Sequence, residues 1–395
     1  MGGKWLKTTV GEFCPLTYGK NLPEKRRKQG TYQVYGSNGP VGFHNKPLVK
    51  GEGIVIGRKG TVGAIHYVAL PFWSIDTTFY VTNSEDRDLR FTYYLLESLG
   101  LEHMNTDSAV PGLNRDAAHA RKILVPGLYE QRAIAHILGS LDDKIELNRQ
   151  MAQTLESIAR AIFKSWFVDF DPVKAKMEGK QPEGMTEEIA ALFPDRLVDS
   201  ELGMIPEGWE YKALGDMINI FDSKRIPLSR SQRKARQGKY PYYGATSIMD
   251  YVDDYIFDGV YVLIGEDGSV KKPDGTPFLQ YVSGKIWVNN HAHVIQGKRL
   301  VTSEYIYLFL SRFNIGPFIT GAVQPKLNQG NLKLIPIISP DDKIMELFNE
   351  TISIVFKKII CLQKECKTLQ GLRDTLLPQL ISGKIRVNQP EDAAA

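Results

Sequence analysis

The stretch KRRKQGTYQVYG at residues 25–36 returns 208 residues later as RKARQGKYPYYG at residues 233–244. Both copies begin with basic residues, continue with Gln-Gly and end in the frame Gly-x-Tyr-x-x-Tyr-Gly. The chain has 395 residues, which is long enough for two domains. The repeat therefore predicts that a whole domain around this stretch is duplicated.

Further matched blocks occur in the same order in both halves. IVIGRKGTV at residues 54–62 corresponds to VLIGEDGSV at residues 262–270, again at an offset of 208. A short insertion around KPDGTPF lengthens the offset to 214. SAVPGLN at residues 108–114 then corresponds to GAVQPKLN at residues 321–328. The order and spacing of these blocks indicate two copies of one domain.

Each copy contains short β-branched and aromatic runs between glycines, such as GIVIG, AIHYVAL and YVLIG. Such runs favour strands joined by turns, and FTYYLLESL and SEYIYLFLSRF favour one helix in each copy. Strand-like runs before proline close the copies, at residues 123–126 and 333–336. We expect two α+β domains in tandem, at residues 1–126 and 206–338.

After each copy, in regions 127–170 and 339–386, apolar residues recur at alternating spacings of four and three. The positions are Ile134, Leu138, Leu141, Ile145, Asn148, Ala152, Leu155, Ala159, Ile162 and Trp166, and then Phe348, Ile352, Val355, Ile359, Leu362, Cys366, Leu369, Arg373, Leu376 and Leu380. This heptad seam predicts two helices of roughly 38 residues that separate the domains and form a coiled coil. A pseudo-twofold axis relating the halves would make the helices antiparallel.

Two polar residues interrupt the seam, Asn148 and Arg373. They either fix the register of the helices or face solvent at frayed positions. Residues 171–205 are rich in Pro, Gly and charge, which predicts a linker with one short helix at TEEIAALF, and residues 387–395 form a tail.

Positive charge gathers at equivalent places in both copies, although the formal net charge of the chain is only +4. Clustered Lys and Arg neutralise phosphates, and nearby Tyr, Ser, Asn and Gln can add polar contacts to DNA. The alternative is a basic loop that is merely solvated. We expect these residues to bind DNA: Lys25, Arg26, Arg27, Lys28, Tyr32, Tyr35, Ser37, Asn38, Arg58, Lys59, Asn114, Arg233, Lys234, Arg236, Lys239, Tyr240, Tyr243, Lys326 and Asn328.

No pattern in the sequence supports chemistry by this chain itself. His291 and His293 alternate along a predicted strand, but no carboxylate or cysteine cluster is evident beside them, so we expect a structural or DNA-facing role. Asp258, Glu266 and Asp267 suggest a nuclease metal site only weakly, because the first copy has basic residues there. We therefore expect no catalytic residue and no metal.

The three cysteines have no metal-ligand spacing, the N-terminus lacks a signal-peptide core, and no apolar run is long enough to span a membrane. These features predict a cytoplasmic protein without a membrane partner.

The central helical region combines QRAIA at residues 131–135, LDDKI at 141–145 and FKSWF at 163–167. With the later GMIPEGWE and LRDTLLPQLISGKI, this order resembles the specificity subunit of type I restriction–modification systems over essentially the whole chain. The resemblance implies a noncatalytic subunit whose two target recognition domains read the halves of a bipartite, asymmetric double-stranded DNA site. It also implies helical spacers that dock two modification (methyltransferase) subunits, to which restriction subunits are added.

The resemblance further implies that S-adenosylmethionine, Mg²⁺ and ATP are bound by those partners and not by this chain. Exposed apolar and acidic side chains beyond the seam would form the docking surface: Asp142, Asp143, Glu146, Phe163 and Phe167. The second helical region matches less well, so docking of two equal partners is less secure. A stand-alone duplicated DNA-binding protein without enzymatic partners is the main alternative, and an enzyme that cuts DNA by itself is a weaker one.

Overall fold

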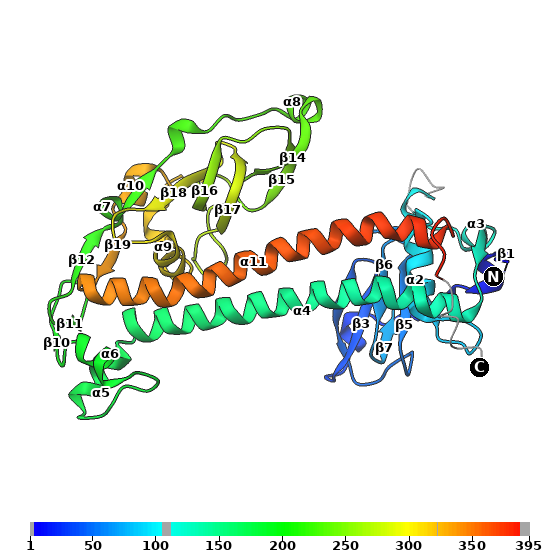
Figure 1. Ribbon diagram of the computed structural model, residues 1–395, viewed down its shortest axis with the longest axis horizontal. Coiled ribbons are helices and arrows are strands. Elements are labelled where there is room, and N and C mark those ends of the chain that lie inside the picture. Colours follow the sequence, from blue (N-terminus) through cyan, green and yellow to red (C-terminus); the bar gives the residue numbers. More distant parts are fainter. Residues whose placement is uncertain (1–3, 105–111, 322, 388–395) are drawn as a thin grey trace. The chain divides into compact units, whose positions relative to one another are not determined.

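The computed structural model describes residues 4–104, 112–321 and 323–387. The chain forms two compact units, one made of Met1–Asn148 with Glu365–Ala395 and the other of Arg149–Lys364. Each unit contains one globular domain and one half of each of two long helices, α4 and α11 (Figure 1). The units therefore do not follow the tandem order of the sequence, because the first unit uses both ends of the chain.

The two long helices are α4 (Leu128–Phe167) and α11 (Asp342–Ile381), each of 40 residues. At 1.5 Å per residue each is about 60 Å long. In the first unit Asp142 of α4 accepts a hydrogen bond from Arg373 near the end of α11 (2.7 Å). In the second unit Phe163, near the end of α4, packs on Phe348 near the start of α11, with ring centroids 6.0 Å apart. The pairing is antiparallel in both units, which confirms the predicted coiled coil.

All twenty predicted seam positions are buried or half-buried. Asn148 is completely buried, so the solvent-facing alternative is wrong for this residue, and neither of its amide atoms has a hydrogen-bond partner among the described residues. A buried polar residue in a seam costs stability and disfavours other alignments of the helices. Arg373 is half-buried and forms an ion pair with Asp142.

The first globular domain has three small sheets. A two-stranded sheet pairs β1 (Leu6–Thr9) with β9 (Lys122–Val125). The four-stranded sheet has the order β2 (Thr17–Tyr18), β8 (Thr78–Thr82), β5 (Gly53–Gly57), β6 (Ile65–Val68), and the three-stranded sheet has the order β4 (Gly39–His44), β3 (Tyr32–Gly36), β7 (Phe72–Ser74). The helices of this domain are α1 (Val10–Phe13), α2 (Leu89–Glu97) and α3 (Arg115–His119).

The second globular domain repeats these elements. Its two-stranded sheet pairs β12 (Glu210–Ala213) with β19 (Pro336–Ser339). The six-stranded sheet has the order β13 (Ile218–Ile220), β18 (Ala292–Gly297), β16 (Phe257–Gly265), β17 (Leu279–Val288), β14 (Gln237–Tyr243), β15 (Ile248–Val252). The helices of this domain are α7 (Leu214–Met217), α8 (Arg230–Ala235), α9 (Ser303–Leu310) and α10 (Gln329–Lys333).

The strand registers confirm the duplication. Val34 of β3 lies opposite Trp73 of β7 in a parallel pair, and Tyr242 of β14 lies opposite Trp287 of β17 in the same way. One difference separates the copies: the long strand β17 takes the place of both β6 and β7. The second domain therefore has one continuous sheet where the first has two.

Two local predictions were wrong. The closing strand of the second domain is Pro336–Ser339 and not residues 333–336, because Asn328 caps helix α10, which continues to Lys333. The short helix predicted at TEEIAALF is confirmed as α6 (Glu187–Leu192), but the rest of the predicted linker is folded too, with α5 (Asp171–Met177) and the strand pair β10 (Leu197–Val198) and β11 (Ile205–Pro206). Its Val173 and Phe193 are buried in the core of the second unit.

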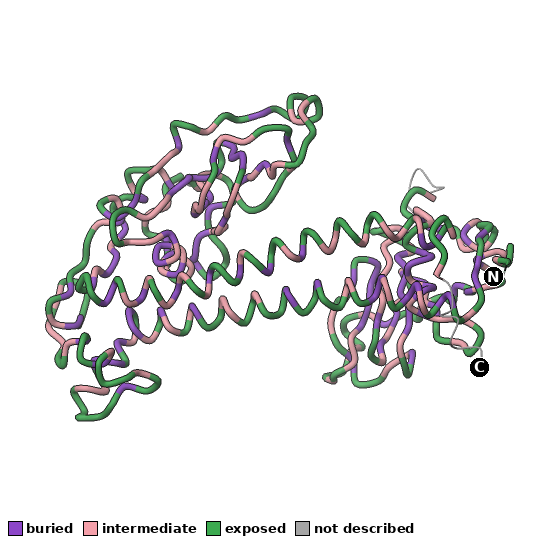
Figure 2. The backbone as a smooth tube through the Cα atoms, in the orientation of Figure 1, coloured by how far each residue is buried: buried purple, intermediate pink, exposed green. Residues whose placement is uncertain are grey.

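Each unit builds its core around its share of the helices, as the buried segments in Figure 2 show. In the first unit Ile134 and Leu138 of α4, Leu380 and Ile381 of α11, and Phe91 of α2 belong to one buried cluster. In the second unit Phe163 of α4 and Phe348 of α11 pack with the fully buried Tyr305 of α9.

A carboxylate at the start of α4 joins the two ends of the chain in the first unit. Glu130 accepts hydrogen bonds from the Trp5 indole (3.0 Å) and from the Arg386 guanidinium (2.8 Å). Burial alone would raise the pKa of Glu130, but these hydrogen bonds and the charge of Arg386 lower it. No helix in the described part of the chain is long and apolar enough to cross a membrane.

Candidate nucleic-acid interface

The first basic loop presents Lys25, Arg26 and Lys28 to solvent around a short 3-10 helix, η1 (Glu24–Arg26). No carboxylate pairs with these three side chains among the residues that the structure describes. Arg27 differs, because its guanidinium donates a hydrogen bond to the Val41 carbonyl (2.5 Å). Three of the four predicted cations are thus available for phosphate, and Arg27 holds the loop against the neighbouring hairpin.

A tryptophan fixes the basic segment in each domain. The Trp73 indole donates a hydrogen bond to the Lys20 carbonyl (2.9 Å), and the Trp287 indole donates one to the Ile226 carbonyl (2.6 Å). Arg236 stacks on the Trp287 ring, with its guanidinium carbon 4.9 Å from the ring centroid. The repeated Trp therefore places equivalent loops at equivalent positions on the two sheets.

The second basic loop is more neutral than its sequence window suggests. Arg233 forms an ion pair with Asp250 (3.2 Å), and Arg236 forms one with Asp253 (2.9 Å). These carboxylates lie on or just beyond β15, across the hairpin from the basic run, so counting charges along the sequence does not find them. Lys234 and Lys239 are exposed and have no carboxylate partner in the described part of the chain.

The polar side chains predicted to bind DNA divide into two groups. Tyr35 is 8% exposed, packs on Phe72 and donates its hydroxyl hydrogen to Gln33, so it belongs to the core. Ser37 is also buried, and its hydroxyl donates to the Thr77 carbonyl (2.7 Å). The structure leaves the others exposed or half-buried: Tyr32, Asn38, Tyr240 and Tyr243.

Asn114 and Asn328 occupy equivalent helix N-caps. The Asn114 side-chain oxygen accepts from the backbone of α3, and the Asn328 oxygen accepts from the backbone N–H of Asn331 in α10 (2.8 Å). Both therefore hold the start of a helix. The nearby Lys59 and Lys326 are exposed, and Lys326 lies 3.4 Å from Glu266.

Backbone hydrogen bonds show which residues of the two domains are equivalent here. The Leu113 N–H donates to the Arg58 carbonyl, and the Leu327 N–H donates to the Glu266 carbonyl, both at 2.9 Å. Arg58 and Glu266 therefore occupy the same position in the two domains. The strand registers add Phe79 and His293 as a second equivalent pair.

Two further pairs complete this arrangement. Tyr18 lies opposite Phe79 in the β2–β8 register, and continuation of the β13–β18 register places Asp222 opposite His293. The residues after the two N-caps, Arg115 and Gln329, also correspond. We call Tyr18, Arg58, Phe79 and Arg115 the first quartet, and Asp222, Glu266, His293 and Gln329 the second quartet.

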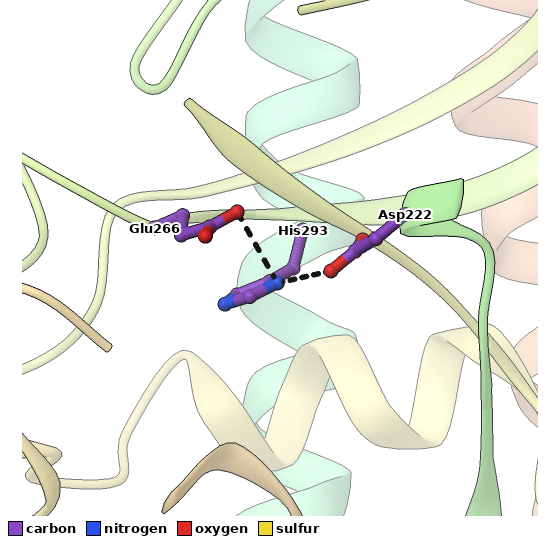
Figure 3. Close-up of side chains that lie close together, drawn as sticks. All are labelled: Asp222, Glu266 and His293. Carbon is purple, nitrogen blue, oxygen red and sulfur yellow. Dashed lines mark hydrogen bonds and ion pairs between the residues drawn. The ribbon is translucent and has the colours of Figure 1, made fainter. Parts of the chain in front are cut away.

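The second quartet is a network of charged and polar groups around the buried Asp222 and His293, and Figure 3 shows these two residues with Glu266. His293 Nδ1 lies 2.6 Å from an Asp222 oxygen and 3.7 Å from a Glu266 oxygen, and its Nε2 lies 2.7 Å from the Leu327 carbonyl. Gln329 donates to the same Asp222 oxygen at 2.7 Å. Sequence reasoning missed these carboxylates beside the histidine, because Asp222 lies 71 residues away from His293.

Asp222, Glu266 and His293 offer ligand atoms within 4.8 Å of one another, which is close enough for a metal site. Arg225, however, donates to Glu266 (2.7 Å) and lies 3.5 Å from Asp222, so its guanidinium already pairs with both carboxylates. His291 lies apart from this group and pairs with Asp267 (2.5 Å). The geometry is that of an internal ion network.

The helical residues predicted to dock a partner serve the chain itself. Phe163 and Phe167 are at most 3% exposed and belong to the core of the second unit. Asp142 accepts from Tyr94 and Arg373, and Asp143 accepts from Arg90. The predicted exposure is wrong for Phe163 and Phe167, because a single helix read in isolation shows no tertiary neighbours, whereas Asp143 and Glu146 are exposed as predicted.

A different set of apolar residues on α4 is exposed. Leu147, Met151 and Ile158 are 50%, 38% and 45% exposed and recur at spacings of four and seven, which places them on one face of the helix. We call these three residues the outer stripe. The comparable residues of α11, Ile354 and Leu372, are 71% and 46% exposed and lie farther apart.

Comparison with known proteins points to one family. A family model described as the type I restriction modification DNA specificity domain matches residues 3–157 and again residues 206–369. The MjaIX specificity subunit of Methanocaldococcus jannaschii, part of a type I restriction enzyme, is 28% identical over 420 residues, covering 98% of this chain and 91% of the relative. The HindI specificity subunit of Haemophilus influenzae is 28% identical over 70% of this chain and 71% of its own length.

The fold has a solved counterpart as well. The crystal structure of a type I restriction–modification S subunit from M. genitalium superimposes with a TM-score of 0.60 at 16% identity, covering 95% of this chain and 96% of that one.

Asp222→Asn should destabilise the protein at pH 7 by about 3 kcal/mol, because it breaks a buried ion pair. Burial alone would raise the pKa of Asp222, but the His293 and Val294 hydrogen bonds and the Arg225 charge lower it. A lowered folded pKa stabilises the protein above the ordinary aspartate pKa of about 4, and this stabilisation is lost as the pH falls through the folded pKa. Urea unfolding at pH 7, 5 and 3.5 should therefore show the two proteins converging towards low pH.

Asp258→Asn is the matched control, because Asp258 is exposed in the same domain. Its unfolding free energy should stay within about 0.5 kcal/mol of the unsubstituted protein at each pH. A constant difference between Asp222→Asn and the unsubstituted protein at all three pH values would contradict the assignment of Asp222 as the ionised centre of the network.

Proposed function

This chain belongs to the type I restriction–modification DNA specificity family and is the noncatalytic DNA-specificity subunit of such an enzyme, and from this premise we propose how it reads DNA. The first globular domain (residues 1–126) reads one half of a split DNA site and the second (residues 206–338) reads the other. The observation that carries this proposal is that the two domains share one backbone arrangement but carry different side chains at equivalent positions. Two half-sites of different sequence are the expected targets.

Exposed cations would bind the DNA backbone in both domains. Those of the first domain are Lys25, Arg26, Lys28 and Lys59, and those of the second are Lys234, Lys239 and Lys326. Phosphate contacts of this kind fix the position of the protein on the duplex without reading sequence. Ion pairing of Arg233 and Arg236 leaves the second domain with fewer free cations, so the first domain contributes more to the salt-dependent affinity.

The partners follow from the same premise. Two modification subunits dock on the helical regions, and restriction subunits complete the enzyme in the cytoplasm. S-adenosylmethionine, Mg²⁺ and ATP belong to those subunits. The outer stripe of α4 supports a docking role, because contiguous exposed apolar side chains on a helix favour a protein partner.

Adenine methylation in cells should test the reading function directly. The chain is produced with the modification subunits encoded beside it, and methylated adenines are mapped across the genome. We expect a split motif that disappears when this chain is deleted. Exchange of residues 1–126 for the corresponding domain of a relative should change one half of the motif only, because each domain reads its half-site independently. A change in both halves, or methylation independent of this chain, would contradict the proposal.

Replacing Lys25, Arg26 and Lys28 together with Ala should weaken DNA binding by the modification complex. Each lost phosphate contact should make the slope of log K against log salt shallower by about 0.9, so we expect a change of about 2–3 in all. Replacement of Lys357, Lys358 and Lys367 on α11 removes the same charge elsewhere and is the control. Equal effects of both triple variants would mean that only net charge matters, and not the basic loop.

Met151→Glu with Ile158→Glu should reduce co-purification of the modification subunit by at least tenfold, because two carboxylates would be buried in an apolar contact. Gln153→Glu with Ser157→Glu adds the same charge on another exposed face of α4 and should leave co-purification unchanged. Both variants should keep the circular dichroism of the unsubstituted chain. Normal recovery of the partner with the stripe variant would show that docking uses another surface.

A further inference from the structure

The first quartet brings two arginines onto one aromatic platform. The rings of Tyr18 and Phe79 have centroids 4.9 Å apart, and Phe79 is completely buried, so the core anchors the platform. The guanidinium carbon of Arg58 lies 5.2 Å from the Tyr18 centroid, and that of Arg115 lies 4.9 Å from it. Stacking of this kind holds a guanidinium in place and leaves its N–H edge free.

The Arg58 guanidinium has no partner other than these rings in the described part of the chain. No carboxylate or hydrogen-bond acceptor pairs with its guanidinium there, and the side chain is half-buried. Among the residues that the structure describes, the one carboxylate that pairs with Arg115 is that of Asp116, at 3.6 Å. A stacked, ordered guanidinium without an acceptor has already lost much of its rotamer freedom. It is therefore preorganised for a planar ligand with two acceptors.

Comparison of the two quartets distinguishes a base from a phosphate as that ligand. A phosphate at this place on the DNA would require a cation in both domains, because the DNA backbone has the same charge in both half-sites. The second domain has Glu266 at the position of Arg58, bound to Arg225 and close to Lys326. The bases, unlike the phosphates, differ between two half-sites. An exchange of Arg for Glu at one backbone position is therefore expected of a residue that reads sequence.

We propose that Arg58, stacked on Tyr18 and Phe79 beside Arg115, recognises a guanine of the first half-site through its N7 and O6 atoms. These two atoms are the paired acceptors of the major groove to which arginine binds in bidentate fashion. The second domain makes no such contact at the corresponding base, because Glu266 and His293 are already paired within the second quartet. The inference rests on the proposed DNA-reading function and adds the base and the residue.

Arg58→Lys tests the inference because it keeps the charge but loses the bidentate geometry. In the methylation map, methylation should no longer require guanine at one position of the half-site read by the first domain. The sequence of the other half-site should stay unchanged. Binding of the complex to a synthetic cognate duplex should weaken about 10- to 100-fold. The salt slope should change by less than about 0.5, because the charge is retained. Replacing that guanine by 7-deazaguanine should weaken binding of the unsubstituted complex but not weaken the variant further.

Arg26→Ala is the matched control, because it removes an exposed cation of the same domain whose counterpart in the second copy, Lys234, is also basic and exposed. It should weaken binding to cognate and mismatched duplexes alike and make the salt slope shallower by about 0.9. Tyr18→Phe should retain the guanine requirement, whereas Tyr18→Leu should relax it, because the ring and not the hydroxyl supports Arg58.

Two results would overturn the assignment of Arg58. One is an unchanged motif at every position with Arg58→Lys, and the other is uniform weakening across all sequences. If the unsubstituted chain gave no split motif in the methylation map, the proposed function itself would be contradicted. Thermal unfolding of Arg58→Lys should match the unsubstituted protein, which separates loss of reading from loss of folding.

Discussion

Burial of one apolar seam on each of two 40-residue helices is the constraint on which the rest of the structure depends. A single helix with an exposed seam gains little from helix propensity alone and is stabilised by tertiary packing. Because the pairing is antiparallel, the end of α11 covers the beginning of α4. The beginning of α11 covers the end of α4. Ile134 and Leu380 thus complete one core, while Phe163 and Phe348 complete the other. The larger buried cluster of each unit therefore includes residues of both helices, although each globular domain also has a smaller cluster of its own.

The two domains combine a constant frame with variable chemistry. The tryptophan that holds the basic loop, the asparagine that caps a short helix and the strand order are the same in both, although β17 joins two sheets into one in the second. The quartets occupy one place in that frame, yet one is an aromatic and guanidinium stack and the other a carboxylate and imidazole network. A backbone that does not depend on the identity of four side chains allows those side chains to change without loss of the fold. This separation suits the proposed reading of two different half-sites by one repeated domain.

Features that are periodic or repeated could be predicted from the sequence. The heptad seam and the duplicated α+β domain both lie in patterns that recur along the chain. Contacts between distant residues could not be predicted. Asp250 and Asp253 neutralise the second basic loop from across a hairpin, and Val173 and Phe193 bury the supposed linker as single apolar residues without a period.

The candidate site shows the same division. Arg58 and Lys59 stand out in the sequence as a basic pair in a repeated block. Their relation to Tyr18 cannot be seen there, because the offset between the copies is 204 at Tyr18 but 208 at Arg58. Only the strand registers align Tyr18 with Asp222. The buried Tyr35 shows the opposite error: a repeated tyrosine in a basic stretch is kept in both copies for packing.

Glu130 binds Trp5 at the beginning of the chain and Arg386 near its end. Leu380 and Ile381 join the same core. On the ribosome, the N-terminal domain therefore emerges first but lacks part of its interior until the last segment has been synthesised. The second unit, made of the continuous segment Arg149–Lys364, has all its residues available earlier. Domains generally fold from the N-terminus onwards during synthesis, but the first unit cannot complete its core until Leu380 and Ile381, which follow the whole second unit in the sequence, have been translated.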